Sequence, residues 1–156
     1  MIADPAVIND LQTSCGLLAT IIEQYRVDGM QIRVLGLKGL GRKFYPHWHQ
    51  ALESHLNIFL KQLLRFGADP SYQVGPVTTA ADLRALFTRN AESATRAFAM
   101  MCNSRKKAWN SRADAVPDEY EHAIQDLQSQ IEHLEEWLKL IAGLGPQDFI
   151  GALVEV

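Results

Sequence analysis

Four long segments of the chain repeat apolar residues at steps of three and four, and this spacing restricts the fold more than any other feature. In the segment from 5 to 34 the repeating residues are Ile8, Leu11, Cys15, Leu18, Ile22 and Tyr25. Such spacing buries one face of an α-helix against a core. The pattern recurs at about 41–66, at about 79–112 and from Pro117 to the glycines that begin at Gly143. No segment alternates as a β-strand would, so the sequence predicts an all-α protein.

Local signals predict where some of these helices begin. Thr79-Ala80-Ala81-Asp82 has the spacing of a capping box, with Asp82 in place of glutamate, and predicts that the third helix begins after Thr79. Pro117 suits the first turn of the fourth helix. Pro46 lies near the start of the second helix. That helix should therefore either begin at His47 or have kinked first turns.

The connections predict how the helices are arranged. The first and third are short, so they should join antiparallel neighbours. The middle connection, from Ala68 to Thr78, contains turn-forming residues and is long enough to cross a bundle from end to end. The apolar tail from Asp148 to Val154 can form a short fifth helix. We expect a single domain over residues 1–156, an antiparallel four-helix bundle with a long middle crossover, which is the ferritin-like layout.

Composition excludes some classes of partner. A net charge of −3 is too small to favour nucleic acid, and no apolar stretch approaches the roughly 18 residues that cross a bilayer. The N-terminus MIADPAVINDL has an acid and a proline where a signal peptide needs a basic end and an apolar run. Cys15 and Cys102 lie in apolar helical patterns without metal-site spacing, so we expect reduced, buried thiols. These features predict a cytoplasmic protein.

The sequence resembles the bacterioferritins over nearly its whole length. The matching stretches keep the family's order and spacing without a gap; they are Val7-Ile8-Asn9-x-Leu11, Gln24-Tyr25, Leu35-Gly36-Leu37-Lys38, Leu64-Arg65-Phe66-Gly67-Ala68-Asp69-Pro70 and Leu140-Ile141-x-x-Leu144-Gly145-x-Gln147. The resemblance implies a ferritin-like bundle that assembles into a hollow shell. In that family a di-iron centre inside each bundle oxidises ferrous iron, and haem sits between two methionines at each two-fold contact.

The residues that perform this chemistry in bacterioferritins are replaced in this chain. The family's ligands are a Glu on the first helix, a Glu-x-x-His on the second, a Glu on the third and a Glu-x-x-His on the fourth. Hard carboxylates suit iron, and each imidazole completes a coordination shell. The matching positions here are Leu18, Ala51, Ser54, Ala94, Leu127 and Gln130. The haem-methionine position matches Leu52, which cannot bind iron.

The resemblance and these replacements together imply a non-catalytic bacterioferritin-like subunit. We expect no ferroxidase activity, no haem and no other cofactor, with iron present only as mineral in an assembled shell. The partners would be further copies of the chain or a catalytic bacterioferritin subunit, and neither nucleic acid nor a membrane. The alternative is a ferritin-like bundle repurposed as a metal-independent binding or scaffold protein. A relocated iron site at Glu119-x-x-His122 is disfavoured, because no second such pair exists to face it.

A group of polar residues falls on the helix faces that surround haem in bacterioferritins: Glu23, Arg26, His49 and Glu53. His49 and Glu53 are four apart and therefore share one face of the second helix. The simplest interpretation is an ion-pair network between subunits, in which Arg26 pairs with Glu53 or Glu23. Two alternatives remain open, a transition metal held at the two-fold contact by Glu23, His49 and Glu53, and haem held by His49.

Overall fold

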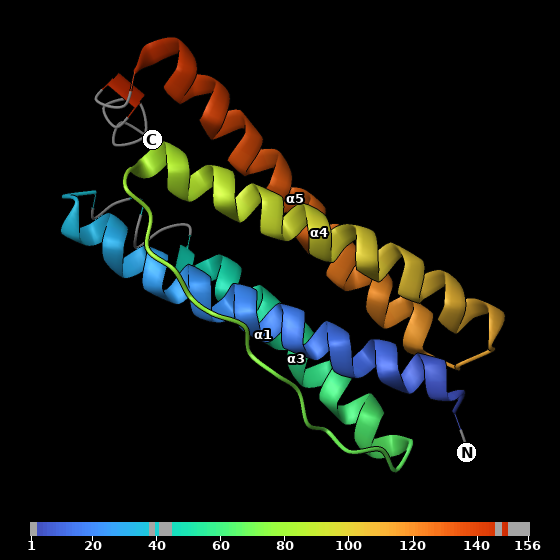
Figure 1. Ribbon diagram of the computed structural model, residues 1–156. Helices are drawn as coiled ribbons and strands as arrows, with labels where there is room; N and C mark the ends of the chain where they lie inside the picture. The colour runs from blue at the N-terminus through green and yellow to red at the C-terminus, as the bar shows by residue number, and fades with distance from the viewer. Residues whose placement is uncertain (1–2, 38–39, 41–44, 146–147, 150–156) are drawn as a thin grey trace.

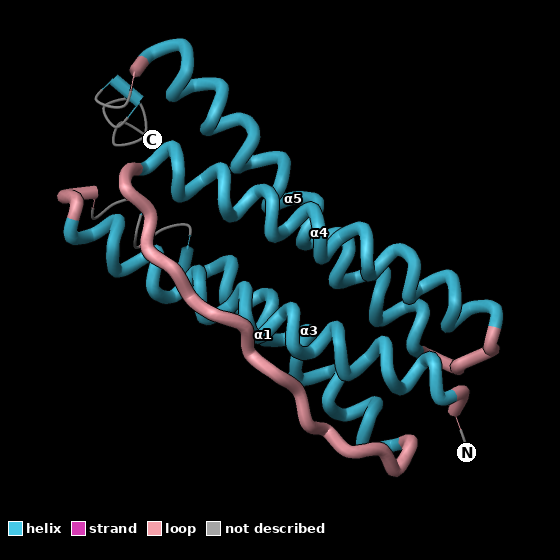
Figure 2. The backbone as a smooth tube through the Cα atoms, viewed as in Figure 1, coloured by secondary structure: helices cyan, strands magenta, loops and turns pink. Residues whose placement is uncertain are grey.

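The computed structural model describes residues 3–37, 40, 45–145 and 148–149 (Figure 1). Its helices are α1 (Pro5–Val34), α3 (Tyr45–Arg65), α4 (Leu83–Asn110) and α5 (Val116–Leu144). Figure 2 shows loops and turns between them, and no strand occurs among the residues described. The expected all-α class is confirmed. None of the helices in this part of the chain combines the length and apolar character that a membrane span requires.

Each of the four helices packs against two others. α1 contacts α3 and α4, and α5 likewise contacts α3 and α4. In Figure 1 α1 and α3 run in opposite directions, as do α4 and α5, while α3 and α4 run the same way. The apolar faces meet in one core, whose largest fully buried side chains include Tyr25, Tyr45, Phe59, Phe87 and Tyr120.

The segment between α3 and α4, residues 66–82, runs along the length of α1 (Figure 2). Side chains of α1 hold its backbone in place. Gln12 donates to the carbonyl of Asp69, and Gln24 both donates to the carbonyl and accepts from the N–H of Thr78. Residue numbers rise together along α1 and this segment, so the two run in the same direction. We call residues 66–82 the crossover.

The crossover also explains why α4 begins later than its sequence predicts. Asp82 is itself the N-cap residue, and its carboxylate accepts a hydrogen bond from the N–H of Ala85 at 2.8 Å. The expected capping box that starts at Thr79 is therefore wrong. Ala80 uses its N–H and its carbonyl to bond the side chain of Gln31 on α1, so this residue does not form a helical turn.

The other helix limits follow the sequence closely where they are described. α1 spans Pro5–Val34 as expected, and Asp4 caps it by accepting from the N–H of Ala6. Tyr45 is already helical, so α3 begins before His47 and has Pro46 in its first described turn. The expected start of this helix near 41 lies outside the described residues.

Most of the expected fifth helix also lies outside the described residues. Asp148 and Phe149 are helical. The Phe149 ring is buried, with its centroid 6.0 Å from that of Phe87 on α4. The end of the chain thus contributes one aromatic side chain to the core.

The two cysteines differ in their surroundings. Cys15 is fully buried in α1 and free, and burial raises the pKa of its thiol to about 12. Cys102 is also free but only half-buried, so the expectation that both thiols are buried is wrong for this one. It packs partly against the core and lines a pocket together with Arg105 of α4 and Pro117 of α5.

Candidate functional site

Three of the positions that the resemblance implies for bacterioferritin iron ligands lie inside the bundle. Leu18 of α1, Ala94 of α4 and Leu127 of α5 have no exposed surface. Their side chains belong to the apolar core. Hydrocarbon has no lone pair for a metal, so these positions contribute packing only. The fourth, Gln130 of α5, is also buried, and its amide oxygen accepts a hydrogen bond from the hydroxyl of Tyr25 at 3.0 Å.

The two remaining positions, Ala51 and Ser54, lie on α3 and are less buried than the other four. Ala51 is half-buried and Ser54 is exposed. The residues one step further along the helix, Leu52 and His55, are the buried ones. Leu52 has no exposed surface, so the position that matches the haem methionine packs inside the bundle and is not available to a subunit contact. On α3 the inward face is thus offset by one residue from the register that the resemblance implies.

His55 forms the one contact in this region that has the chemistry of a site. Its Nε2 lies 2.5 Å from Oδ2 of Asp126, which joins α3 to α5. The histidine is buried and the carboxylate is nearly half exposed. His55 is a residue that sequence reasoning missed. Its spacing from Leu52 and Phe59 could have shown that it faces inward, but no local signal connects it to a residue on another helix.

Two donors are fewer than a stable transition-metal site requires, since such sites use three or four protein ligands. No group of three or more histidines, cysteines or acids with metal-site geometry occurs in the described ranges. The His55–Asp126 pair therefore fits a structural hydrogen bond between helices.

The polar residues expected at a two-fold contact lie on α1 and α3, and two of them pair within the chain. Arg26 pairs with Glu23 of the same helix, and this bond raises the pKa of the guanidinium. His49 is half-buried and lines a pocket of about 190 Å³ together with Arg26. Glu53 is exposed and has no ion pair within the described part of the chain. Within the single chain Arg26 thus pairs with Glu23, and the ion-pair network expected between subunits stays a prediction.

The remaining histidine motifs lie at the surface. His122 of Glu119-x-x-His122 is exposed, while Glu119 is half-buried. His47 is exposed as well. His133 is exposed and has its ring centroid 6.1 Å from that of Trp48. Among the described residues, none of these imidazoles belongs to a group of side chains that could hold a metal ion.

A buried polar network, which sequence reasoning missed, links α1, α4 and the crossover. Asp28 of α1 has no exposed surface, and its Oδ1 accepts from Arg89 at 2.5 Å and from Gln24 at 2.8 Å. Arg89 also donates to the carbonyl of Thr78 in the crossover. Burial raises the pKa of the Asp28 carboxyl, against the effect of the hydrogen bond from Arg89. A sequence signal existed, because Asp28 lies three residues after Tyr25 on the buried side of α1.

Two tyrosines extend this polar region into the core. Asn90 donates to the hydroxyl of Tyr45 at 2.9 Å, and the rings of Tyr25 and Tyr45 meet edge to face at 5.4 Å. Burial, followed by the nearby charge of Asp28, raises the pKa of Tyr25. Both phenols therefore stay neutral and act as hydrogen-bonding groups.

The bundle thus combines an apolar centre with a polar network at one side, where α1 meets α4 and the crossover.

No protein-family model matches the chain, and no curated protein matches it.

Proposed function

We propose that the chain is a non-catalytic, bacterioferritin-like subunit of an oligomeric shell. The observation that carries the proposal is the packing at Leu18, Ala94 and Leu127, which come from three helices and have no exposed surface. At these three positions, where a bacterioferritin would hold iron with carboxylates, this chain has hydrocarbon, which cannot bind a metal.

The arrangement of the helices adds support for the ferritin-like type of bundle. Two antiparallel helix pairs are joined by a crossover that runs along α1, and this is the layout of that fold. A subunit of this kind contributes wall to a shell, and iron is cargo stored as mineral inside it. Oxidation of ferrous iron is then the task of a catalytic bacterioferritin subunit in the same assembly.

The proposal is tested by adding ferrous iron to the purified protein in air and following the appearance of ferric iron. We expect oxidation no faster than in buffer, because the described part of the bundle holds no carboxylate cluster to bind and orient iron. A catalytic bacterioferritin at the same subunit concentration serves as the positive control. Rapid, saturable oxidation by this chain alone would contradict the proposal.

A second candidate is a metal-independent binding protein built on the same bundle. It is favoured by a separate observation, an arginine-lined pocket between α1 and α4. The two candidates differ in assembly, since a shell subunit must associate and a binding protein need not.

A further inference from the structure

A pocket of about 320 Å³ lies between α1 and α4, beside Pro76 and Thr78 of the crossover. Its α4 wall includes Arg89, Ser93 and Arg96. These residues are four and three apart, so their side chains share one face of the helix. The volume is at the lower end for a small-molecule site.

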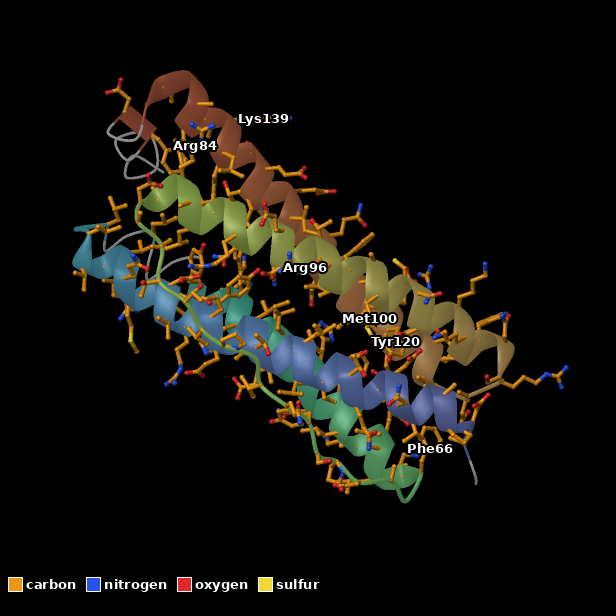
Figure 3. All side chains as sticks on the ribbon, viewed as in Figure 1. Phe66, Arg84, Arg96, Met100, Tyr120 and Lys139 are labelled. Atoms are coloured by element: carbon orange, nitrogen blue, oxygen red, sulfur yellow. The ribbon has the colours of Figure 1, made fainter. Side chains whose placement is uncertain are left out.

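The pocket carries more positive than negative charge. Arg89 is paired with Asp28, whose carboxylate is fully buried behind it. Arg96 is exposed and donates to the hydroxyl oxygen of Ser93 at 3.2 Å. Within the described part of the chain Arg96 forms no ion pair with a carboxylate. Figure 3 labels it on the side of α4 that faces α1, so one uncompensated guanidinium lies at the pocket.

Buried polar atoms next to this pocket have no hydrogen-bond partner among the residues that the structure describes. They are Oδ1 of Asn90, Nε of Arg89 and Oδ2 of Asp28. Asn90 lines the pocket and is only 1% exposed. Most buried polar groups in folded proteins are paired. Nε of Arg89 is a donor that an oxyanion can satisfy, whereas Oδ1 of Asn90 and Oδ2 of Asp28 are acceptors that need a hydrogen from a hydroxyl group or from water. A ligand oxygen with a hydrogen can donate to the Asn90 carbonyl oxygen.

We propose that this pocket binds a small oxyanion, the carboxylate or phosphate group of a compact polar molecule. Arg96 provides the main charged contact, because planar guanidinium groups match the geometry of both oxyanions. The Ser93 hydroxyl accepts from Arg96 and keeps its own hydrogen for the ligand. The site does not depend on the proposed shell function, since it uses none of the residues on which that proposal rests.

The test is a calorimetric titration of the full chain with inorganic phosphate and, separately, with succinate, at constant ionic strength. We expect saturable binding of at least one probe, and the tighter probe identifies which oxyanion the pocket prefers. Arg96→Gln should weaken that binding about tenfold or more, the effect of losing one charge-assisted contact. Its side chain is exposed, so the variant should fold.

The matched control is Arg84→Gln, an exposed arginine at the start of the same helix that does not line the pocket (Figure 3). It removes the same charge and should change the affinity by less than about twofold, because distant surface charges are screened. Ser93→Ala should weaken binding to a smaller extent than Arg96→Gln. Equal losses in Arg96→Gln and Arg84→Gln, or no saturable binding of either probe, would overturn the proposal.

Discussion

The fold changes the acid–base behaviour of the Asp28 carboxyl. Removal from water raises the pKa of its carboxyl above the ordinary value of 3.8, although the hydrogen bond from Arg89 favours the charged form. The folded protein therefore holds a proton at Asp28 over a pH range in which the unfolded chain has already lost it. Within that range the folded state binds more protons, so the free energy of unfolding falls as the pH rises, and it levels off above the folded pKa.

Replacing Asp28 with asparagine keeps the shape of the side chain and removes its titration. We expect the free energy of unfolding of the natural protein to decline, relative to Asp28→Asn, as the pH rises from about 4 towards the raised pKa. Urea unfolding at closely spaced pH values measures both curves. Parallel curves for the two proteins over this range would show that burial does not govern the titration of Asp28.

At the residue scale, the sequence predicts which side chains are buried better than it predicts which side chains contact one another across helices. The apolar stripes placed Leu18, Ala94 and Leu127 inside, and each is fully buried. Periodicity belongs to one helix, so it cannot show that His55 meets Asp126 on another. Arg89, the charged partner of Asp28, was missed for the same reason, because it lies 61 residues away in the sequence.

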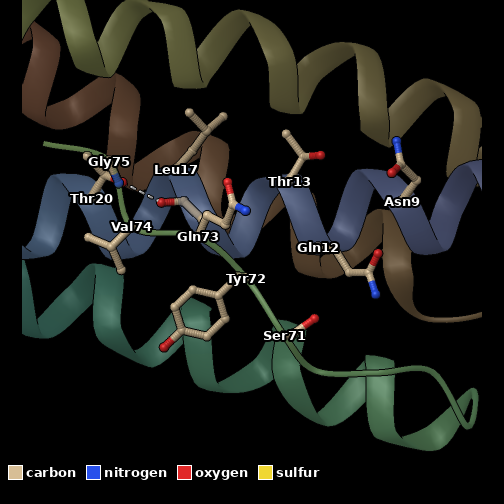
Figure 4. Close-up of a pocket in the computed structure, with 11 residues that line it drawn as sticks. Asn9, Gln12, Thr13, Leu17, Thr20, Ser71, Tyr72, Gln73, Val74 and Gly75 are labelled. Atoms are coloured by element: carbon tan, nitrogen blue, oxygen red, sulfur yellow. Dashed lines mark hydrogen bonds between the residues drawn. The ribbon is translucent and has the colours of Figure 1, made fainter.

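The position of the crossover against α1 depends on one small residue, Gly16. Figure 4 shows it lying against α1, where the N–H of Gly75 donates to Oγ1 of Thr20 at 2.8 Å. Close by, a Cβ atom at Gly16 would stand 2.7 Å from the carbonyl oxygen of Gln73. That distance is too short for a carbon and a backbone oxygen, so only glycine permits this approach. Beside the contact, α1 and the crossover enclose a pocket of about 800 Å³ with an uncharged lining.

Gly16→Ala should therefore destabilise the protein by about 1–3 kcal/mol, the range for overpacking a close contact. The matched control is Gly143→Ala near the end of α5, where an added Cβ meets nothing within 4 Å. Alanine favours the helix there by up to about 1 kcal/mol, so the control should be neutral or stabilising. Thermal unfolding of both variants measures the difference. A Gly16→Ala protein as stable as Gly143→Ala would mean that the crossover is not seated on α1 as described.

The limits of elements could be predicted where local signals act alone. The span of α1 matches its periodicity and its N-terminal proline. The start of α4 could not be predicted, because Gln31 of α1 takes the backbone groups of Ala80 that a capping box would have used. The resemblance predicts that Ala51 and Ser54 face inward, whereas Leu52 and His55 do so in the structure. The face that a helix turns inward is set by its packing against its neighbours, and a resemblance in sequence does not determine that packing.

At the scale of the whole molecule, the all-α class could be predicted from the apolar periodicity, whereas assembly depends on which side chains are exposed at the surface. Large apolar side chains are exposed where α1 ends, at Met30, Val34 and Leu35. Val34 is the most open of them, with 86% of its surface exposed. Leu140 and Leu144 of α5 are exposed near the end of that helix, which lies at the same end of the bundle (Figure 1). Exposed apolar side chains that adjoin one another, as at the end of α1, are typical of a surface that another protein covers.

If the chain is a shell subunit, light scattering should report a particle of many subunits, either alone or after mixing with a catalytic bacterioferritin. Val34→Asp should shift the particle towards smaller species, because a charge in an apolar contact loses its water without gaining a partner. Ser129→Asp adds the same charge at an exposed polar position of α5 and should leave the mass unchanged. A monomer under both conditions would favour the binding-protein alternative. Disassembly by both variants would instead indicate that net charge, and not the apolar end of α1, controls association.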